Sequence, residues 1–378
     1  MGSLDLSQLQ HLWWLLISVI GAAFILMTFV QGGQGLLYCI ARTEVEKSLM
    51  INSLGKKWEI TFTTLVLFGG AFFAAFPLFY STSFGGAYWV WMLILFTFIL
   101  QAVSYEYRKK PDNFLGAKVY EVFLIINGTV SVLLIGIAVG TFFSGSNFTL
   151  SDYNFVTWHH PGRGIEAAFS LFNLSFGLFL VFLARVLGAL YLNNNIEHEV
   201  LNKRTREAAF TNLLWALPFL LYVLISLLVM NGYAVDPISG LVSLEKGKYL
   251  ANLLALPING LGFLLVGLVL VVWGVVSTRF LSSRKGIWFS GLGTVLVVLA
   301  IFSIAGYNNT AFYPSKYDLQ SSLTIFNASS SHYTLTAMCY IALALSVVIG
   351  YVWYVWSILD AKKLREADIL VEGSHEKY

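Results

Sequence analysis

The sequence predicts an all-α integral membrane protein with about nine transmembrane helices. Of its 378 residues, 57% are hydrophobic and 11% are charged, whereas soluble domains carry about 25% charged residues. Apolar stretches of roughly 20 residues, the length that crosses a bilayer, recur along the whole chain. Lipid can surround this much apolar surface, because it replaces water as the solvent of the outer face.

Nine stretches are long and apolar enough to span a membrane. They cover about 12–40, 60–80, 85–104, 119–143, 165–192, 208–230, 254–277, 286–306 and 334–359. The first has no basic segment before it and is too long for a signal peptide, so it is taken as a helix. We expect residues 1–378 to form a single membrane domain, with a short cytoplasmic tail over 360–378.

The positive charges predict the orientation of these helices. If the N-terminus lies outside, eighteen of the 23 Lys and Arg residues fall in inside segments, four fall outside, and Arg185 lies within a span. Inside segments of membrane proteins carry this excess. We therefore predict an outside N-terminus and an inside C-terminus. The first and second sets of four helices could form two four-helix bundles with the ninth helix peripheral, although no internal repeat is visible in the residues.

Several function classes have no support in the sequence. The net charge of +3 and the absence of a basic stripe argue against nucleic-acid binding. All six histidines fall in loops, tails or span ends, so no pair within the membrane could ligate a haem. His159-His160 alone is weak evidence for a metal site. We therefore expect no cofactor-binding, metal or catalytic residue in this chain.

Polar residues near one end of the predicted helices are the better candidates, because each is costly at membrane depth. The predicted topology brings Glu59, Glu106, Glu121, Gln31 and Gln34 toward the inside face. Such a cluster could take up protons. The alternative is a set of interfacial carboxylates that pair with nearby basic residues, for which the candidates are Lys56, Lys57, Arg108 and Lys118.

Arg185 lies about two turns from the inside end of the fifth span. Its long side chain could extend to the interface. It could instead pair with a carboxylate of this chain or of a partner. The residues leave both alternatives open.

Ordered motifs lie along nearly the whole chain. They are Trp13-Trp14-Leu15-Leu16, Met50-Ile51-Asn52-Ser53 with Trp58-Glu59, Gly69–Pro77 with Tyr80, Tyr105-Glu106-Tyr107-Arg108, Arg204-Thr205-Arg206, Pro314-Ser315 and Ser322–Ser330. In this order they resemble the motifs of subunit II of cytochrome bd-type quinol oxidases. The sequence also departs from the family pattern. Gln31 and Gln34 stand where many members have two Asp residues, and Gln101 stands where an Arg is common. A role that needs charge at Gln31 or Gln34 is therefore in doubt in this chain.

The resemblance implies a haem-free subunit of a bacterial inner-membrane complex that oxidises membrane quinol and reduces O2 to water. The b-type haems and haem d, or a further haem b, would reside in subunit I. This chain would stabilise subunit I and could hold a structural quinone or lipid, and small single-helix accessory subunits could join the complex. The resemblance also implies a role in cytoplasmic proton uptake for Glu59 and Glu106, with Gln31, Gln34, Glu121 and Arg185 as supporting polar residues.

Two other functions fit the bare sequence. A secondary transporter would have inverted repeats and charged residues near mid-membrane, with helices that Pro218 and Pro257 could break. A purely structural subunit would have no proton role. Substitution of Glu59 and Glu106 distinguishes this last alternative from the proton-uptake hypothesis.

Overall fold

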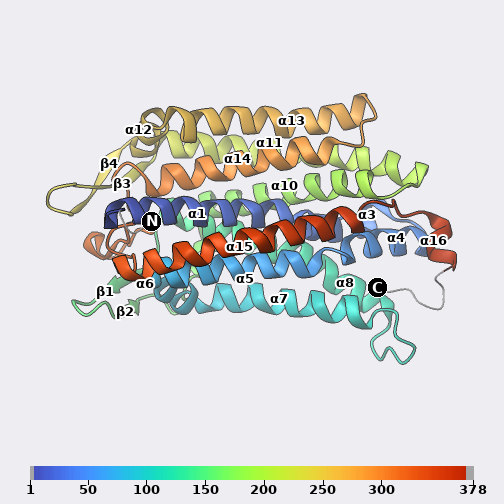
Figure 1. The fold of residues 1–378 in the computed structure, drawn as a ribbon, viewed down its shortest axis with the longest axis horizontal. Helices are drawn as coiled ribbons and strands as arrows, with labels where there is room; N and C mark the ends of the chain where they lie inside the picture. The colour runs from blue at the N-terminus through green and yellow to red at the C-terminus, as the bar shows by residue number, and fades with distance from the viewer. Residues whose placement is uncertain (1–3, 372–378) are drawn as a thin grey trace.

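The computed structural model describes residues 4–371 as an elongated bundle of helices that lie side by side (Figure 1). Within the described residues, nine helical segments are long and apolar enough to cross a membrane, as the sequence predicts. One end of the bundle carries four short strands and is called here the hairpin end. The opposite end, which carries α4 and α16, is called the α4 end. Residues 372–378 of the predicted tail lie outside the described residues.

The first four membrane-crossing segments occupy the N-terminal part of the chain. Their elements are α1 (Leu6–Met27), α2 (Phe29–Gly35), α3 (Leu37–Ile40), α4 (Glu44–Gly55), α5 (Trp58–Ala75), α6 (Pro77–Phe79), the π-helical η1 (Tyr80–Gly86), α7 (Tyr88–Tyr107), α8 (Ala117–Ile126), the π-helical η2 (Asn127–Ser131) and α9 (Val132–Ser144).

The remaining segments and the strands follow. They are β1 (Phe148–Leu150), β2 (Val156–Trp158), the 3-10 helix η3 (Ile165–Phe169), α10 (Leu171–Asn195), α11 (Glu199–Val229), β3 (Asn231–Val235), β4 (Val242–Lys246), α12 (Lys248–Ala255), the π-helical η4 (Pro257–Gly262), α13 (Phe263–Phe280), α14 (Gly286–Gly306), the 3-10 helix η5 (Leu319–Ser321), α15 (His332–Leu359) and α16 (Glu366–Val371).

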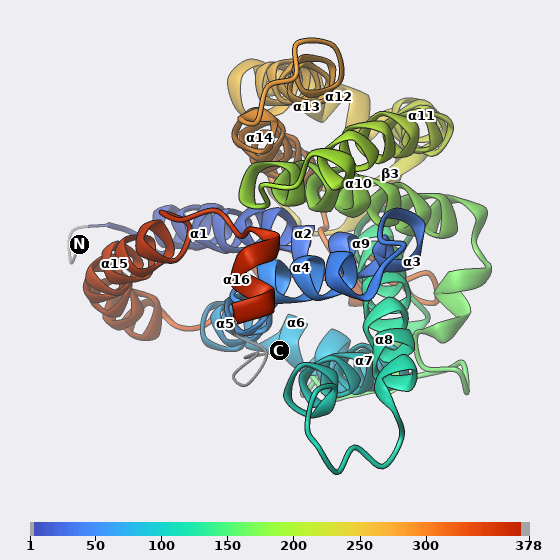
Figure 2. The same cartoon turned by 90° about the vertical axis from the view of Figure 1, so that its right-hand side faces the viewer.

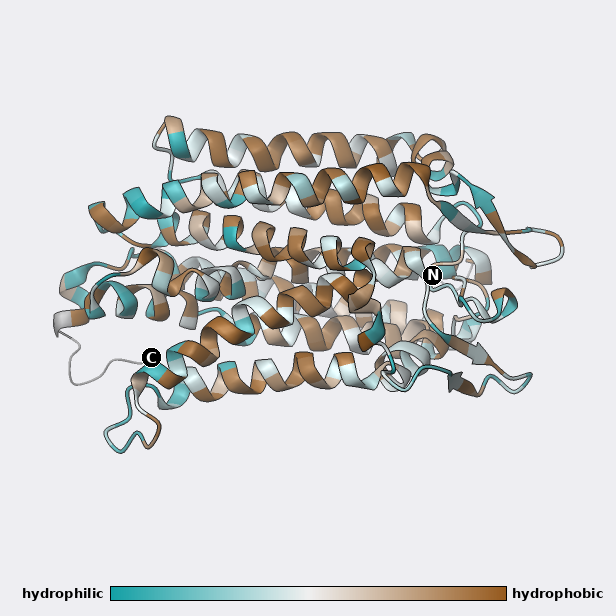
Figure 3. Ribbon diagram, turned by 180° about the vertical axis from the view of Figure 1, so that it is seen from behind, coloured by the Kyte–Doolittle hydropathy of each residue, from teal (hydrophilic) through white to brown (hydrophobic). Residues whose placement is uncertain are grey.

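Apolar residues cover the middle of the bundle and polar residues gather at its two ends (Figure 3). A membrane-spanning bundle needs this distribution, because only its ends meet water and lipid headgroups.

Helix α10 lies at the centre and packs against α2, α9, α11 and α14. Glycines allow the closest of these approaches. A Cβ atom on Gly32 would overlap the backbone of Ala184, and one on Gly188 would overlap the backbone of Gly33. Small residues at helix crossings are the usual means of close packing in membranes. The α2–α10 contact thus holds the polar face of α2 in a fixed position.

Helix α15 lies at the edge of the bundle, beside α1 and α5 (Figure 2). Its far end is fixed by Asp360, which follows the helix. One carboxylate oxygen of Asp360 lies 3.2 Å from Nζ of the fully buried Lys57, and the other accepts a 2.6 Å hydrogen bond from Trp356 Nε1. The peripheral helix is therefore attached to α4 and α5 by a buried charge.

The strands form two antiparallel hairpins, with Phe148 opposite Trp158 in one and Asn231 opposite Lys246 in the other. The sequence analysis did not predict them. The two prolines also behave differently from each other. Pro218 lies within the continuous α11, whereas Pro257 begins η4.

Candidate functional site

A line of neutral polar side chains runs between α2, α7 and η2 and is called here the amide seam. It comprises Gln31, Gln34, Thr97, Gln101, Tyr105 and Asn127, all of them buried. Gln31 Nε2 donates to Gln101 Oε1 at 2.8 Å, and Gln34 Nε2 donates to the Tyr105 hydroxyl at 3.0 Å. Longer contacts of 3.4 Å join Gln31 to Asn127 and Asn127 to Thr97.

The backbone explains why these side chains meet. Thr97, Gln101 and Tyr105 are spaced by four residues, so they lie on one face of α7. The π-helical turn η2 begins at Asn127. The next residue is Gly128, where a Cβ atom would overlap the backbone oxygen of Gln31, so only glycine lets η2 approach α2 this closely.

Several polar atoms of the seam are buried without a protein partner. They are Gln31 Oε1, Gln34 Oε1 and Gln101 Nε2, and Trp58 Nε1 beside the seam is in the same state. The Trp58 ring stacks on Tyr105 with a centroid distance of 5.7 Å. Buried polar groups normally find a partner, and ordered water is the common one where side chains do not reach. The seam is therefore suited to bind water.

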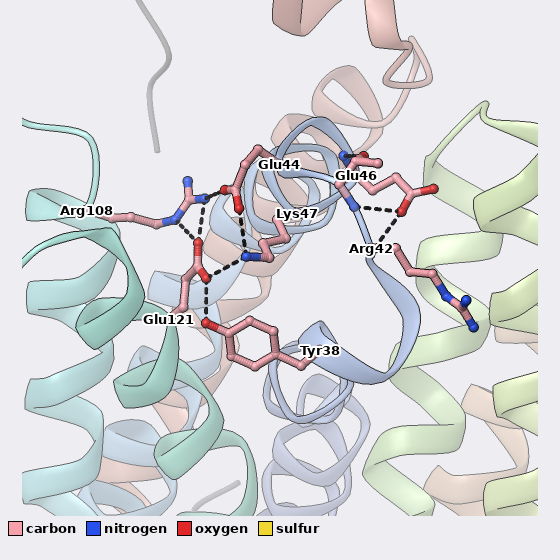
Figure 4. Close-up of polar contacts among 8 residues, drawn as sticks. Tyr38, Arg42, Glu44, Glu46, Lys47, Arg108 and Glu121 are labelled. Carbon is pink, nitrogen blue, oxygen red and sulfur yellow. Dashed lines mark hydrogen bonds and ion pairs between the residues drawn. The ribbon is translucent and has the colours of Figure 1, made fainter.

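The second polar group lies at the α4 end and is called here the ion cluster, comprising Tyr38, Glu44, Lys47, Arg108 and Glu121 (Figure 4). Glu121 accepts hydrogen bonds from Arg108 Nε at 3.1 Å and Nη2 at 2.8 Å on one oxygen. Its other oxygen accepts from the Tyr38 hydroxyl at 2.7 Å and from Lys47 Nζ at 3.2 Å. Four donors thus hold the buried carboxylate in its charged form. The cluster ties α3, α4, α7 and α8 together.

Glu59 and Glu106 lie outside both groups. Both residues are exposed, and Glu106 pairs with Lys110 at 3.1 Å. Within the described part of the chain, the Glu59 side chain has no ion pair or hydrogen bond. Each acid nevertheless follows an aromatic residue of the seam region directly in the sequence: Glu59 follows Trp58, and Glu106 follows Tyr105.

The structure thus brings together Gln31 and Gln34 but separates them from Glu59, Glu106 and Glu121. Of the four basic residues expected to pair with these acids, only Arg108 does so, with Glu121. Lys57 pairs with Asp360 instead. The sequence analysis missed Asn127, Tyr105 and Lys47 as members of these groups. The four-residue spacing on α7 could have identified Tyr105, whereas the approach of Asn127 depends on the packing of η2.

Arg185 faces α2 and η2 from α10. Its Nη2 lies 3.5 Å from Thr129 Oγ1, and its Nε is buried without a partner. No Asp or Glu oxygen of residues 4–371 lies within 4.0 Å of the guanidinium. Pairing of Arg185 with a described carboxylate of the same chain is therefore wrong, whereas extension to the interface and pairing with a carboxylate of a partner stay predictions.

In the part of the chain that the structure describes, no group of three His, Cys, Asp or Glu side chains could hold a metal ion. His159 stacks on Tyr317 at 3.8 Å and its Nε2 lies 2.9 Å from Thr149 Oγ1, so these contacts explain it as a structural residue.

An apolar cavity lies closer to the hairpin end, between α1, α5, η1, α7 and α9. Its walls are largely aromatic and include Phe24, Phe68, Phe84, Trp91, Phe142 and Phe302. Its volume of about 40 Å³ is well below the roughly 300–1,000 Å³ of typical ligand pockets, so the cavity as it stands has room for only small groups.

Comparison with known proteins identifies the family. The family described as cytochrome bd terminal oxidase subunit II matches residues 9–359. The chain is 28% identical to cytochrome bd-I ubiquinol oxidase subunit 2 of Escherichia coli K12, over 99% of this chain and 100% of that protein. It is 27% identical to a probable cytochrome oxidase subunit 2 of Haemophilus influenzae, with the same coverage. The fold is similar to that of a chain in the structure of bd oxidase from Geobacillus thermodenitrificans, with a TM-score of 0.61, 14% identity and coverage of 94% of this chain and 99% of that one. The chain belongs to the subunit II family of cytochrome bd terminal oxidases and is a multi-pass membrane subunit of a quinol:O2 oxidoreductase complex.

Proposed function

We propose that this chain stabilises the haem-bearing subunit I and conducts protons into the complex through the amide seam. Reduction of O2 consumes protons, and hydrocarbon does not conduct them, so a buried reaction centre needs a polar route from one membrane face. The observation that carries the proposal is the seam itself, with its free buried polar atoms at Gln31, Gln34 and Gln101.

The route begins at the α4 end. Glu59 and Glu106 offer exposed carboxylates next to Trp58 and Tyr105, and both can collect protons from water. From Tyr105 the seam continues through Gln34, Gln31 and Gln101 to Asn127 and Thr97. Thr97 lies eight residues from Tyr105 along α7, about 12 Å deeper. Because amides do not titrate, water bound to them would carry the proton.

The surrounding residues support this route without joining it. Glu121 is held in the ion cluster by four donors, so its part is to fix α7 and α8 in position. Arg185 contacts Thr129 of η2 from α10 and contributes positive charge near the seam.

The α4 end faces the cytoplasm in this proposal, as the distribution of Lys and Arg predicts. Uptake of protons from this side, with quinol oxidised at the other face, would build a proton gradient in the bacterial inner membrane. In this family the haems sit in the partner subunit. We propose that subunit I carries the b-type haems with haem d or a further haem b, that this chain holds a structural quinone or lipid, and that small single-helix subunits join the complex.

The test is substitution of the two entry acids in the purified complex. Glu59→Gln, Glu106→Gln and the double variant are expected to slow quinol-driven O2 uptake by about tenfold or more, in line with loss of a proton-transfer group. Haem content and thermal stability should stay at the wild-type values. Glu207→Gln is the matched control, because Glu207 is a partly exposed acid at the same end that pairs with Arg279 at 3.6 Å.

Unchanged turnover in all three variants would support a purely structural subunit. The observation that favours this alternative is the ion cluster, which joins α3, α4, α7 and α8 through Glu121. The match to the oxidase subunit family over residues 9–359 replaces the transporter alternative, which predicted charged residues near mid-membrane around broken helices.

A further inference from the structure

The apolar cavity near the hairpin end, called here the aromatic cavity, is small but large enough for a molecule. Its volume is about 40 Å³, whereas roughly 10–15 Å³ is enough for one water molecule. Two small residues, Gly21 on α1 and Ala138 on α9, line it at positions where larger side chains would fill the space. The cavity therefore has room for a diatomic molecule and is too small for a quinone ring.

The chemistry of the walls disfavours an ordered water molecule. None of the described residues that line the cavity is charged. Ser83 and Trp91 carry the only polar side-chain groups among these residues, and the two groups contact each other, with Trp91 Nε1 3.4 Å from Ser83 Oγ. A buried water needs about two to four polar partners, whereas apolar cavities stay dry and bind xenon. The aromatic cavity thus contrasts with the amide seam, whose unpaired polar atoms suit water.

Contacts between aromatic rings keep the cavity open. Phe142 meets Phe302 edge to face, with an interplanar angle of 82° and 5.7 Å between the ring centroids. Phe68 meets Phe302 in the same way, at 89° and 6.1 Å. On the α7 side, Phe84 stacks on Trp91 with a centroid distance of 4.0 Å. Because rings that hold one another in this way have few other positions, the walls do not collapse into the space.

Side chains that are partly exposed form one wall of the cavity. They belong to Leu65 and Phe68 on α5 and to Phe84 on η1. A smaller cavity of about 20 Å³ lies next to the first and shares Ser83 and Ala138 with it. A small apolar molecule can therefore reach the aromatic cavity through side-chain motions alone, without a change in the packing of the helices.

From these observations we propose that the aromatic cavity binds molecular oxygen, which is a substrate of the oxidoreductase complex to which this chain belongs. O2 has no charge and no dipole, so it enters an apolar space without the cost of a buried polar group. In the cavity it gains dispersion contacts with the surrounding rings. The inference does not depend on the proton route, because it uses no residue of the amide seam and neither entry acid.

Crystals of the purified two-subunit complex, pressurised with xenon or with O2, test the proposal. Xenon is an apolar probe whose anomalous scattering shows its position. Wild-type crystals should hold xenon in the aromatic cavity and O2 at the same place. Val139→Ile adds a methyl group to the lining and should lower the xenon occupancy, and Ala138→Leu should abolish it. Val139→Ala enlarges the cavity and should retain xenon.

Ala102→Val is the matched control, because Ala102 is a partly buried residue of α7 that lines neither the aromatic cavity nor the smaller one beside it. This variant should bind xenon like the wild type. Overpacking can destabilise a fold, so Ala138→Val and Val139→Ile carry the test if Ala138→Leu does not assemble.

An aromatic cavity that takes up neither xenon nor O2 in the wild-type complex would overturn the proposal. So would ordered water in the cavity, or a lipid chain that keeps both gases out. Xenon occupancy that is the same in the wild type, Val139→Ile and Ala138→Val would also contradict it, since the gas would then bind outside the space that these side chains line.

Discussion

The amide seam and the ion cluster lie on neighbouring parts of the same helices, yet their buried polar groups differ in charge and in how completely they are hydrogen-bonded. Helix α7 contributes Gln101 to the seam and, seven residues later, Arg108 to the cluster. The cluster holds full charges, and both oxygens of its central Glu121 have two donors each. The seam holds only neutral groups and leaves several of their atoms free. The comparison indicates that the buried carboxylate keeps its charge where donors surround both of its oxygens, whereas neutral amides stay partly unpaired and can bind water.

The largest effect is expected from Glu121→Gln. This change keeps the shape of the side chain but leaves only the exposed Glu44, at 2.9 Å from Lys47 and 3.9 Å from Arg108, to balance two buried positive charges. Removal of one partner of a buried ion pair typically costs about 3–5 kcal/mol. A large fall in the thermal stability of the purified complex should follow, measured by the loss of assembled heterodimer on heating.

The control is Glu106→Gln, because the Glu106–Lys110 pair is exposed and such pairs contribute about 0–1 kcal/mol. Equal stability losses in the two variants would contradict the distinction between the buried ion cluster and the exposed pair of the proposed entry acid.

An intermediate effect is expected when charge is introduced into the seam. Gln31→Glu or Gln101→Arg alone would bury an unpaired charge and should destabilise the complex. The double variant places opposite charges on side chains that are joined at 2.8 Å in the wild type. It should recover stability, with a coupling energy in the range of about 0.5–3 kcal/mol found for contacting residues.

A double-mutant cycle on thermal stability measures this coupling. Gln31→Leu serves as a neutral comparison, since it removes the hydrogen bond without adding charge. Simple additivity of the two charged substitutions would mean that the residues do not interact, and the seam as described would be wrong.

The smallest effect is expected at an exposed ion pair of the α4 end. The Arg365 side chain donates to Glu197 at 2.7 Å and holds the pKa of the Glu197 carboxyl below its ordinary value. A carboxyl with a lowered pKa in the folded state stabilises that state above its ordinary pKa, about 4.3 for Glu, and this stabilisation is lost as the pH falls through the lowered value. Attachment of α16 should therefore weaken in acid.

Hydrogen exchange of the α16 amides at pH 7, 4 and 3 measures this weakening after correction for intrinsic exchange rates. Glu197→Gln should remove part of the pH dependence. Protection that is identical in the two proteins at every pH would show that the pair contributes nothing to the attachment, in contrast to the buried cluster.

The sequence predicts the helices well and the side-chain pairing poorly, for physical reasons. A membrane helix is encoded locally, by about 20 apolar residues, so nine such segments are recognised directly. The burial of Lys47 depends on Glu121, 74 residues later, and cannot be seen in the local sequence. Because Lys47 belongs to a segment expected to be an inside loop, its place within α4 was missed. The grouping of Gln31 with Gln34 near the α4 end was predictable from topology, whereas their separation from Glu59 depends on how α5 is rotated.

The contact of Asp360 with Lys57 also bears on the order in which the chain is completed during synthesis. Lys57 emerges from the ribosome some 300 residues before Asp360. Until then the Lys57 ammonium group has no acid to balance it at its buried position. A nascent chain that lacks α15 therefore keeps an unbalanced positive charge at Lys57. This charge is a physical difference by which insertion and proteolysis machinery could tell such a chain from one that has added α15 and Asp360.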